Sequence, residues 1–218
     1  AEGYTVGTDL FAAPYDFRRG PKQFMEFDYP RLKSLIENAS AANGGAPVVL
    51  CSLSMGGSFG HAFLTRFVDA AWKQRYIDSW ISLSSTFNGS PQMVEQLASG
   101  TLYADERAAA FWLDKNDIRE FMLNWPGNVW MVPQASAGSA DDRVIVRTVD
   151  SSSGGQDARN FTLSEAHEFF ALTGADAAAD MLEHTFGGTD LATLNDPGVR
   201  LHCWYTDDVP TPAEYVYD

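Results

Sequence analysis

The sequence predicts an α/β fold built on a parallel sheet, for three reasons. Apolar and β-branched residues at 47–53 form a strand pattern that runs into a tight turn of small residues at 54–57. A stripe of apolar residues at helical spacing follows this turn. A second strand pattern then follows the helix, and such strand–helix–strand order is typical of parallel strands joined by a crossover helix.

The region before the central strand predicts a strand and a loop over 4–15, and then one helix. Asp16 and Arg18 are spaced so that a carboxylate and a guanidinium can form a charge-assisted fork, which would pin the loop. Apolar residues spaced by three and four predict a helix of about 10–15 residues, with Asp28 and Pro30 in its first turn. The apolar positions of this helix are Phe24, Phe27, Leu32, Leu35 and Ile36.

The turn after the central strand places Ser54 where a nucleophile could stand. A strand–turn–helix segment of this kind presents a serine hydroxyl at the carboxyl end of a parallel sheet. Ser52 occupies the position of the usual first glycine, and Gly56 keeps the second. The alternative is an ordinary polar turn, because a five-residue match is weak evidence by itself.

Beyond a strand at 76–83 and a loop at 84–89, the pattern changes to an inserted, aromatic-rich helical cap. We expect helices at 92–98, 106–111, 117–123 and 175–186, and a short strand within 141–150. Thr162 and Glu165 have the spacing of a capping box and predict a further helix start. The expected division is therefore 1–89 for the core, 90–190 for the cap, and 191–218 for a return to a core strand and tail.

Composition describes an acidic globular chain. Apolar residues make up 45% of its 218 residues, and its formal charge is −14. Nucleic acid is not expected as a partner, because phosphate binding needs a basic face. The His and Cys residues have no metal-ligand spacing, so neither a metal nor a cofactor is expected. Fourteen Phe, six Trp and eight Tyr indicate either a rich core or a cleft for an apolar substrate.

Three glycosylation sequons indicate a secretory route, at Asn38, Asn88 and Asn160. Each is expected at a helix end or in a loop. Cys51 lies in the central strand and is expected to be a buried thiol, and a bond between Cys51 and Cys203 is not required. The chain begins without an initiating Met or a signal-peptide core, so we interpret its start as a processing or fragment boundary.

Several segments, in the right order along almost the whole chain, carry a resemblance to one family. They are 13–18 (Ala-Pro-Tyr-Asp-Phe-Arg), 47–57, 72–77, 81–83, 130–133 (Trp-Met-Val-Pro), 197–199, 203–205 and 210–218. With these segments the chain resembles the lecithin:cholesterol acyltransferase family, which includes lysosomal phospholipase A2 and the phospholipid:diacylglycerol acyltransferases. The resemblance covers about 200 residues and is more specific than the turn motif alone.

The resemblance implies an α/β-hydrolase-type parallel sheet with helices on both faces and an inserted cap, incomplete at both ends. It also implies cleavage of a lipid acyl ester through a serine acyl-enzyme, with water or an alcohol as acceptor. Ser54 would be the nucleophile, and the Met55 backbone N–H would supply half of the oxyanion hole. The family's cysteine at the position of Cys203 pairs with one further on, so Cys203 would bond to a residue outside this chain. Leu53 stands where the family usually has histidine.

The triad partners implied by the resemblance, an Asp and a His, would follow Asp218. Inside the chain, Asp207 or Asp208 is the alternative acid. No histidine is placed as a base, since His61, His167 and His184 fall on helices and His202 falls in a strand. We therefore expect this chain alone to be inactive, because a serine without a base is a weak nucleophile.

Two main hypotheses follow. The first is the central part of a phospholipase A or phospholipid-dependent acyltransferase, completed by further terminal segments or a second processed chain. It would act on a phospholipid or another acyl lipid, in a secreted or lysosomal setting. The second is a catalytically inactive structural or binding protein with the same fold. A third, an unrelated intracellular α/β hydrolase, is disfavoured by the sequons.

Overall fold

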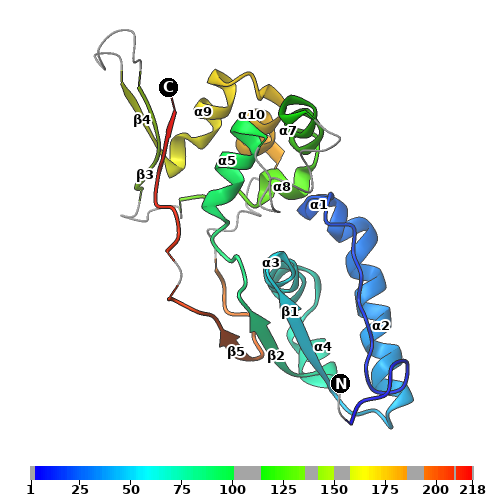
Figure 1. Cartoon of the computed structure of the whole chain (residues 1–218). Helices are drawn as coiled ribbons and strands as arrows, with labels where there is room; N and C mark the ends of the chain where they lie inside the picture. Colours follow the sequence, from blue (N-terminus) through cyan, green and yellow to red (C-terminus); the bar gives the residue numbers. More distant parts are fainter. Residues whose placement is uncertain are drawn as a thin grey trace. The chain divides into compact units, whose positions relative to one another are not determined.

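The computed structural model describes residues 3–100, 114–135, 142–149, 158–185, 194–208 and 210–217 (Figure 1). They belong to two units that the chain enters alternately. The first unit comprises Ala1–Phe87 and Leu194–Asp207, and the second comprises Asn88–Thr193 and Asp208–Asp218. Each unit has a sheet and helices of its own.

The first unit is built on a parallel sheet of three strands in the order β1-β2-β5. The strands are β1 (Val48–Leu53), β2 (Ile77–Leu83) and β5 (Arg200–Trp204). Leu53 pairs with Leu83 and Leu83 pairs with Trp204, so the three strands end level with one another. The predicted α/β class and parallel sheet are confirmed.

The helices of the first unit precede and follow β1. The first is continuous from α1 (Pro21–Gln23) through a π-helical turn (Phe24–Asp28) into α2 (Tyr29–Ala42). After β1 come α3 (Met55–Ala62), a π-helical turn (Phe63–Phe67) and α4 (Ala70–Tyr76). Rings from these helices form the core, where Tyr29 and Phe63 are almost fully buried and Phe59 packs edge-on against Phe24 at 5.0 Å.

Two details before β1 differ from the sequence prediction, and one agrees. The first helix begins at Pro21 rather than near Asp28, which lies inside it, buried, and accepts a hydrogen bond from Arg19 at 2.9 Å. Within described residues 4–15 no strand forms, and only the bridge between Val6 and Leu10 is present. The predicted fork is confirmed, since Arg18 Nε and Nη2 donate to the two carboxylate oxygens of Asp16 at 2.8 and 2.7 Å.

The second unit combines helices with a mixed sheet in the order β4-β3-β6. Its strands are β3 (Val144–Thr148), β4 (Arg159–Thr162) and β6 (Tyr215–Tyr217), with β4 antiparallel and β6 parallel to β3. Its α-helices are α5 (Pro91–Ser99), α7 (Lys115–Leu123), α8 (Pro126–Trp130), α9 (Ala166–Leu172) and α10 (Asp176–Asp180). A 3₁₀ turn (Leu163–Glu165) precedes α9, and a π-helical turn (Met181–Thr185) follows α10.

Several predictions for this unit are confirmed. The expected helices at 92–98 and 117–123 correspond to α5 and α7, and the strand within 141–150 is β3. The capping box is present, because the Thr162 backbone N–H donates to Glu165 Oε2 at 2.9 Å. β4 and β6 were not predicted, and the helix expected at 106–111 lies outside the described residues.

Candidate nucleophile elbow

Ser54 forms the turn between β1 and α3 in a strained backbone conformation. Its φ is 54° and its ψ is −127°. Such a conformation costs an L-residue about 1–3 kcal/mol and persists only where the surroundings hold it. In the part of the chain that the structure describes, the other non-glycine residue with positive φ is Ser84, at 43°. Ser84 stands just beyond the end of β2, so the two strained serines follow neighbouring strands.

Backbone hydrogen bonds hold both turns. The Ser54 N–H donates to Leu83 O at 3.0 Å, and the Ser84 N–H donates to Trp204 O at 2.7 Å. The Gly57 N–H donates to Ser54 O at 2.9 Å and closes the first turn of α3. The parallel ladder therefore continues one residue past the strand ends and fixes Ser54 at the carboxyl edge of the sheet, with its side chain exposed.

The start of α3 lies tightly against the loop that follows β2. A Cβ atom at Gly57 would be 1.9 Å from Ser85 Oγ and 2.2 Å from Ser85 Cβ, so only glycine fits there without movement. Ser85 is itself held by a 2.5 Å contact between its hydroxyl and that of Ser82. The Ser58 hydroxyl donates to Thr86 O at 2.8 Å. This close approach gives the second of the two glycines after Ser54 a physical reason.

Ser52 occupies the other unusual position of the motif, and it has a partner. Its hydroxyl accepts a hydrogen bond from Trp80 Nε1 at 2.9 Å. Trp80 is 1% exposed, and its ring lies against α3 where a Cβ on Gly60 would be 3.5 Å from it. A serine in place of the usual glycine is therefore accommodated because the neighbouring strand supplies a donor for its hydroxyl.

A cavity of about 210 Å³ lies beside the elbow. Its lining includes Leu53 and Gly56 from the elbow, and also Tyr15, Phe59 and Trp80. The Tyr15 ring is stacked on Phe59 at 4.1 Å, and burial raises the pKa of the Tyr15 hydroxyl. The lining is thus mostly apolar, and its polar side chains include the Tyr15 phenol and the Ser52 hydroxyl.

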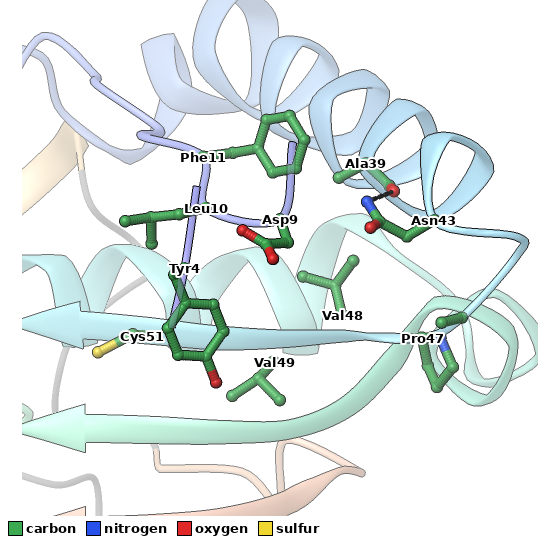
Figure 2. A pocket seen from close by; sticks show the side chains of 11 residues that line it. Tyr4, Asp9, Leu10, Phe11, Ala39, Asn43, Pro47, Val48, Val49 and Cys51 are labelled. Carbon is green, nitrogen blue, oxygen red and sulfur yellow. Dashed lines mark hydrogen bonds between the residues drawn. The ribbon is translucent and has the colours of Figure 1, made fainter. Parts of the chain in front are cut away.

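A second cavity lies at the opposite end of β1 and does not include Ser54. Figure 2 shows it between the segment that carries Tyr4 and Leu10, the start of β1 at Val48, and the end of α2 at Asn43. The Asn43 amide donates to Ala39 O at 2.9 Å in its wall. Its lining does not include Ser54, and it shares Cys51 with the cavity beside the elbow.

No histidine side chain in the described residues is hydrogen-bonded to Ser54. The Nε2 of His61 donates to Asn195 O at 2.7 Å, and burial lowers the pKa of this imidazole. His202 lies on β5, beside Ile81. The side chain of His184 lies outside the described part of the structure. The geometry therefore shows an exposed serine hydroxyl at an elbow, with no base bonded to it within the described part of the chain.

Met55 is the first residue of α3, so its N–H has no acceptor within the helix. It adjoins Ser54 at the turn. This is the position from which a backbone donor could face an oxyanion formed at the serine.

The two cysteines are exposed thiols that do not reach each other. Cys51 is on the sheet face that it shares with Ile81 and His202, whereas Cys203 shares the other face with Ser82. They also lie on strands separated by β2, about 9–10 Å apart, beyond the Cα separation that a disulfide spans. The prediction that Cys51 is buried is wrong, because alternate β1 side chains are exposed within the described structure.

The three sequon asparagines are all exposed. Asn38 lies in α2 four residues before its end, and Asn88 lies in the turn after β2. Asn160 lies in strand β4 rather than at a helix end or in a loop. Gly89, which follows Asn88, has a φ of 82°, and a Cβ atom added to it would lie 2.7 Å from Pro133 N.

The described residues contain no cluster of three or more His, Cys, Asp or Glu side chains arranged to hold a metal ion. They also contain no helix with the length and apolar character required to span a membrane.

Sequence reasoning identified Ser54 and the turn but missed the residues that support it. Ser85 and Trp80 reach the turn from β2 and its following loop, 28 or more positions along the chain. A small residue at 52 and a tryptophan in the next strand were visible signals, but the pairing register that joins them was not. The register came only with the structure.

Comparison with known proteins gives a consistent set of matches. The family model described as lecithin:cholesterol acyltransferase matches residues 1–185. Lysosomal phospholipase A and acyltransferase is 34% identical over 216 residues in both Rattus norvegicus and Homo sapiens. Phosphatidylcholine-sterol acyltransferase of Homo sapiens is 32% identical over 219 residues.

These relatives cover 99% of this chain, but the chain covers 48% of the lysosomal proteins and 45% of the sterol acyltransferase. The chain therefore spans about half the length of the curated relatives it matches. A solved chain of the Tle4–Tli4 complex aligns over 66% of this chain with a TM-score of 0.45 and 15% identity.

Proposed function

Because the chain belongs to the lecithin:cholesterol acyltransferase family, we propose that it carries the nucleophile of a lipid acyl-ester hydrolase or O-acyltransferase. The substrate would be a phospholipid or another acyl lipid, in keeping with the names of the relatives. The acceptor would be water or an alcohol.

One observation carries the proposal: Ser54 has φ 54° and ψ −127° between a parallel strand and a helix. A strained, exposed serine at the carboxyl edge of a parallel sheet is what a nucleophile elbow requires. An ordinary turn would relieve the strain with glycine at this position. The strain is instead held by hydrogen bonds to β2 and within α3.

The reaction would proceed in two balanced steps. Ser54 Oγ forms a bond to the ester carbonyl carbon, its proton passes to a base, and the lysolipid leaves with that proton. Water or an alcohol then attacks the acyl-serine, which releases a fatty acid or a new ester and restores the hydroxyl. The Met55 N–H would stabilise the oxyanion, and such a donor is worth about 3–4 kcal/mol of barrier.

The proposed base and acid are a His and an Asp outside residues 1–218, from further segments or a second chain. We also propose that residues 1–89 form the core, 90–190 the cap, and 191–218 a returning strand and tail. The protein would follow a secretory route, with glycans on exposed Asn38, Asn88 and Asn160. Cys203, an exposed thiol, would pair with a cysteine outside this chain.

A second candidate is a catalytically inactive binding protein with this fold. Leu53, which is 65% exposed, stands beside Ser54 where the family usually has histidine. This observation favours a changed substrate position or a lost activity.

The test uses the complete polypeptide in which this chain occurs and a fluorophosphonate that reacts with activated serines. Wild-type protein should be labelled on Ser54, and Ser54→Ala should not be labelled. Phosphatidylcholine vesicles with and without a soluble alcohol then separate fatty-acid release from acyl transfer. A folded wild-type protein that remains unlabelled and releases no acyl group would favour the inactive binding protein.

A further inference from the structure

The hydrogen bond between Ser52 and Trp80 lies directly beneath the elbow. Ser52 is two residues before Ser54 on β1, and Trp80 belongs to the adjacent strand β2. Leu50 pairs with Trp80 in the register, so the indole reaches diagonally along one sheet face to the Ser52 hydroxyl. The N–H···O distance is 2.9 Å.

Trp80 in turn forms the surface on which α3 rests. Its indole lies 3.5–3.8 Å from where a Cβ on Gly60 would be, and Ser52 Cβ lies 3.7 Å from where a Cβ on Gly56 would be. The two glycines are one helical turn apart, and a Cβ at either would make ordinary van der Waals contact with this surface, so α3 lies directly on it. Phe87 packs edge-on against the indole at 5.7 Å and limits its movement on another side.

The indole orientation depends on Ser52 because Trp80 is almost fully buried. A buried N–H that loses its acceptor is costly, so the ring would have to move to find another. Movement of the ring would displace the helix that rests on it, and the first residue of that helix directly follows Ser54. The position of the elbow is thereby linked to a hydroxyl that the usual glycine at this position does not provide.

We propose that Ser52 is a positioning residue for Ser54, which acts by fixing the Trp80 indole under α3. This inference rests on the proposed function, because it concerns the reactivity of Ser54. It assigns a purpose to the serine at position 52 that a requirement for a small residue alone does not explain.

The first test compares Ser52→Thr with Ser52→Val in the complete polypeptide. The two side chains have the same shape, and only threonine retains a hydroxyl. The second-order rate of fluorophosphonate labelling should stay within about twofold of wild type for Ser52→Thr. It should fall about 3- to 10-fold for Ser52→Val, which is the range expected for one lost net hydrogen bond.

The second test asks whether the effect passes through Trp80. Trp80→Phe removes the indole N–H, so adding Ser52→Val to it should lower the labelling rate no further. In ¹⁵N-tryptophan spectra, the indole signal lost in Trp80→Phe should shift in Ser52→Val and keep its position in Ser52→Thr. If Ser52 contributed only to stability, the same contrast in the indole signal would appear, but the labelling rate of the folded protein would not change.

Ser79→Ala is the matched control. Ser79 is a buried serine on the same sheet whose hydroxyl donates to Asp78 at 2.8 Å, near the opposite ends of the strands. Its loss should lower stability but leave the labelling rate within about twofold, because it does not reach the elbow. Equal slowing by Ser79→Ala and Ser52→Val would overturn the inference.

Two other outcomes would also overturn it: equal labelling of Ser52→Val and Ser52→Thr, or independent effects of Ser52→Val and Trp80→Phe. A folded wild type that is not labelled would contradict the proposed function instead. Hydrogen exchange of the Ser54 amide, which donates to Leu83 O, then decides the inference. Faster exchange in Ser52→Val than in Ser52→Thr supports positioning, and equal exchange rejects it.

Discussion

Replacing Gly57 by alanine is the sharpest test of how the elbow is packed. The added methyl group would lie 1.9 Å from Ser85 Oγ and 2.2 Å from Ser85 Cβ. Rotation of the Ser85 side chain can move its hydroxyl but leaves its Cβ in place. The backbone of α3 or of the loop after β2 must therefore shift, and the contact between Ser85 and Ser82 is lost.

The expected cost follows from three effects. Overpacking costs about 1–3 kcal/mol, and the lost hydrogen bond costs about 1 kcal/mol. The higher helix propensity of alanine offsets up to about 1 kcal/mol of this destabilisation. We expect Gly57→Ala to lower the free energy of unfolding by about 2 kcal/mol.

Gly56→Ala provides the matched control one residue earlier in the same helix. Its methyl group would meet only Ser52 Cβ at 3.7 Å and the Tyr15 hydroxyl at 4.0 Å, which is ordinary contact. This variant should be neutral or gain up to about 1 kcal/mol. Urea unfolding should thus separate the two variants by about 2–3 kcal/mol.

A compensating variant identifies the clash. Ser85→Gly removes both of the closest atoms, and the next atom, Ser85 Cα, is 3.3 Å away. Gly57→Ala combined with Ser85→Gly should therefore be more stable than Gly57→Ala alone. Equal stability of Gly57→Ala and Gly56→Ala would contradict the predicted clash, and so would a failure of Ser85→Gly to restore stability in the Gly57→Ala background.

The remaining predictions concern backbone strain and pH. Ser84→Gly should raise the free energy of unfolding by about 0.5–1 kcal/mol, because glycine removes the cost of positive φ but adds unfolded-state entropy; Ser84→Ala should not, and equal urea midpoints for the two variants would contradict the strain. The hydrogen bonds from Arg18 lower the pKa of Asp16 from 3.8 to about 2. Its contribution to stability is therefore present above pH 3.8 and is lost as the pH falls through about 2. Carboxyl NMR should show a midpoint near 2 that moves toward 3.8 in Arg18→Gln, and an unmoved midpoint would exclude Arg18 as the cause.

Local patterns predicted the elements that depend on neighbours in sequence. The fork between Asp16 and Arg18 and the capping box of Thr162 and Glu165 each join residues two or three positions apart, and both are present. The helix that contains Asp28 was placed too late. Its start depends on Pro21 following an extended Gly20, a signal that the apolar spacing does not contain.

Patterns that depend on partners far along the chain were predicted less well. Cys51 belongs to an apolar run that suggested burial, yet its face of β1 is exposed in the described structure. β6, at the end of the chain, pairs with β3 across more than 60 positions, and its three residues gave no distinct strand signal. Pairing between remote segments depends on their joint packing, which no single window of sequence describes.

The sequence by itself determined the strand, turn and helix around Ser54, because apolar periodicity and small turn residues act over a few positions. Only the tertiary structure decided how that turn is held. It placed Ser85 against Gly57 and brought the Trp80 indole to Ser52. The physical reason is that the parallel register of β1 and β2 sets these contacts, and the register is a property of the assembled sheet.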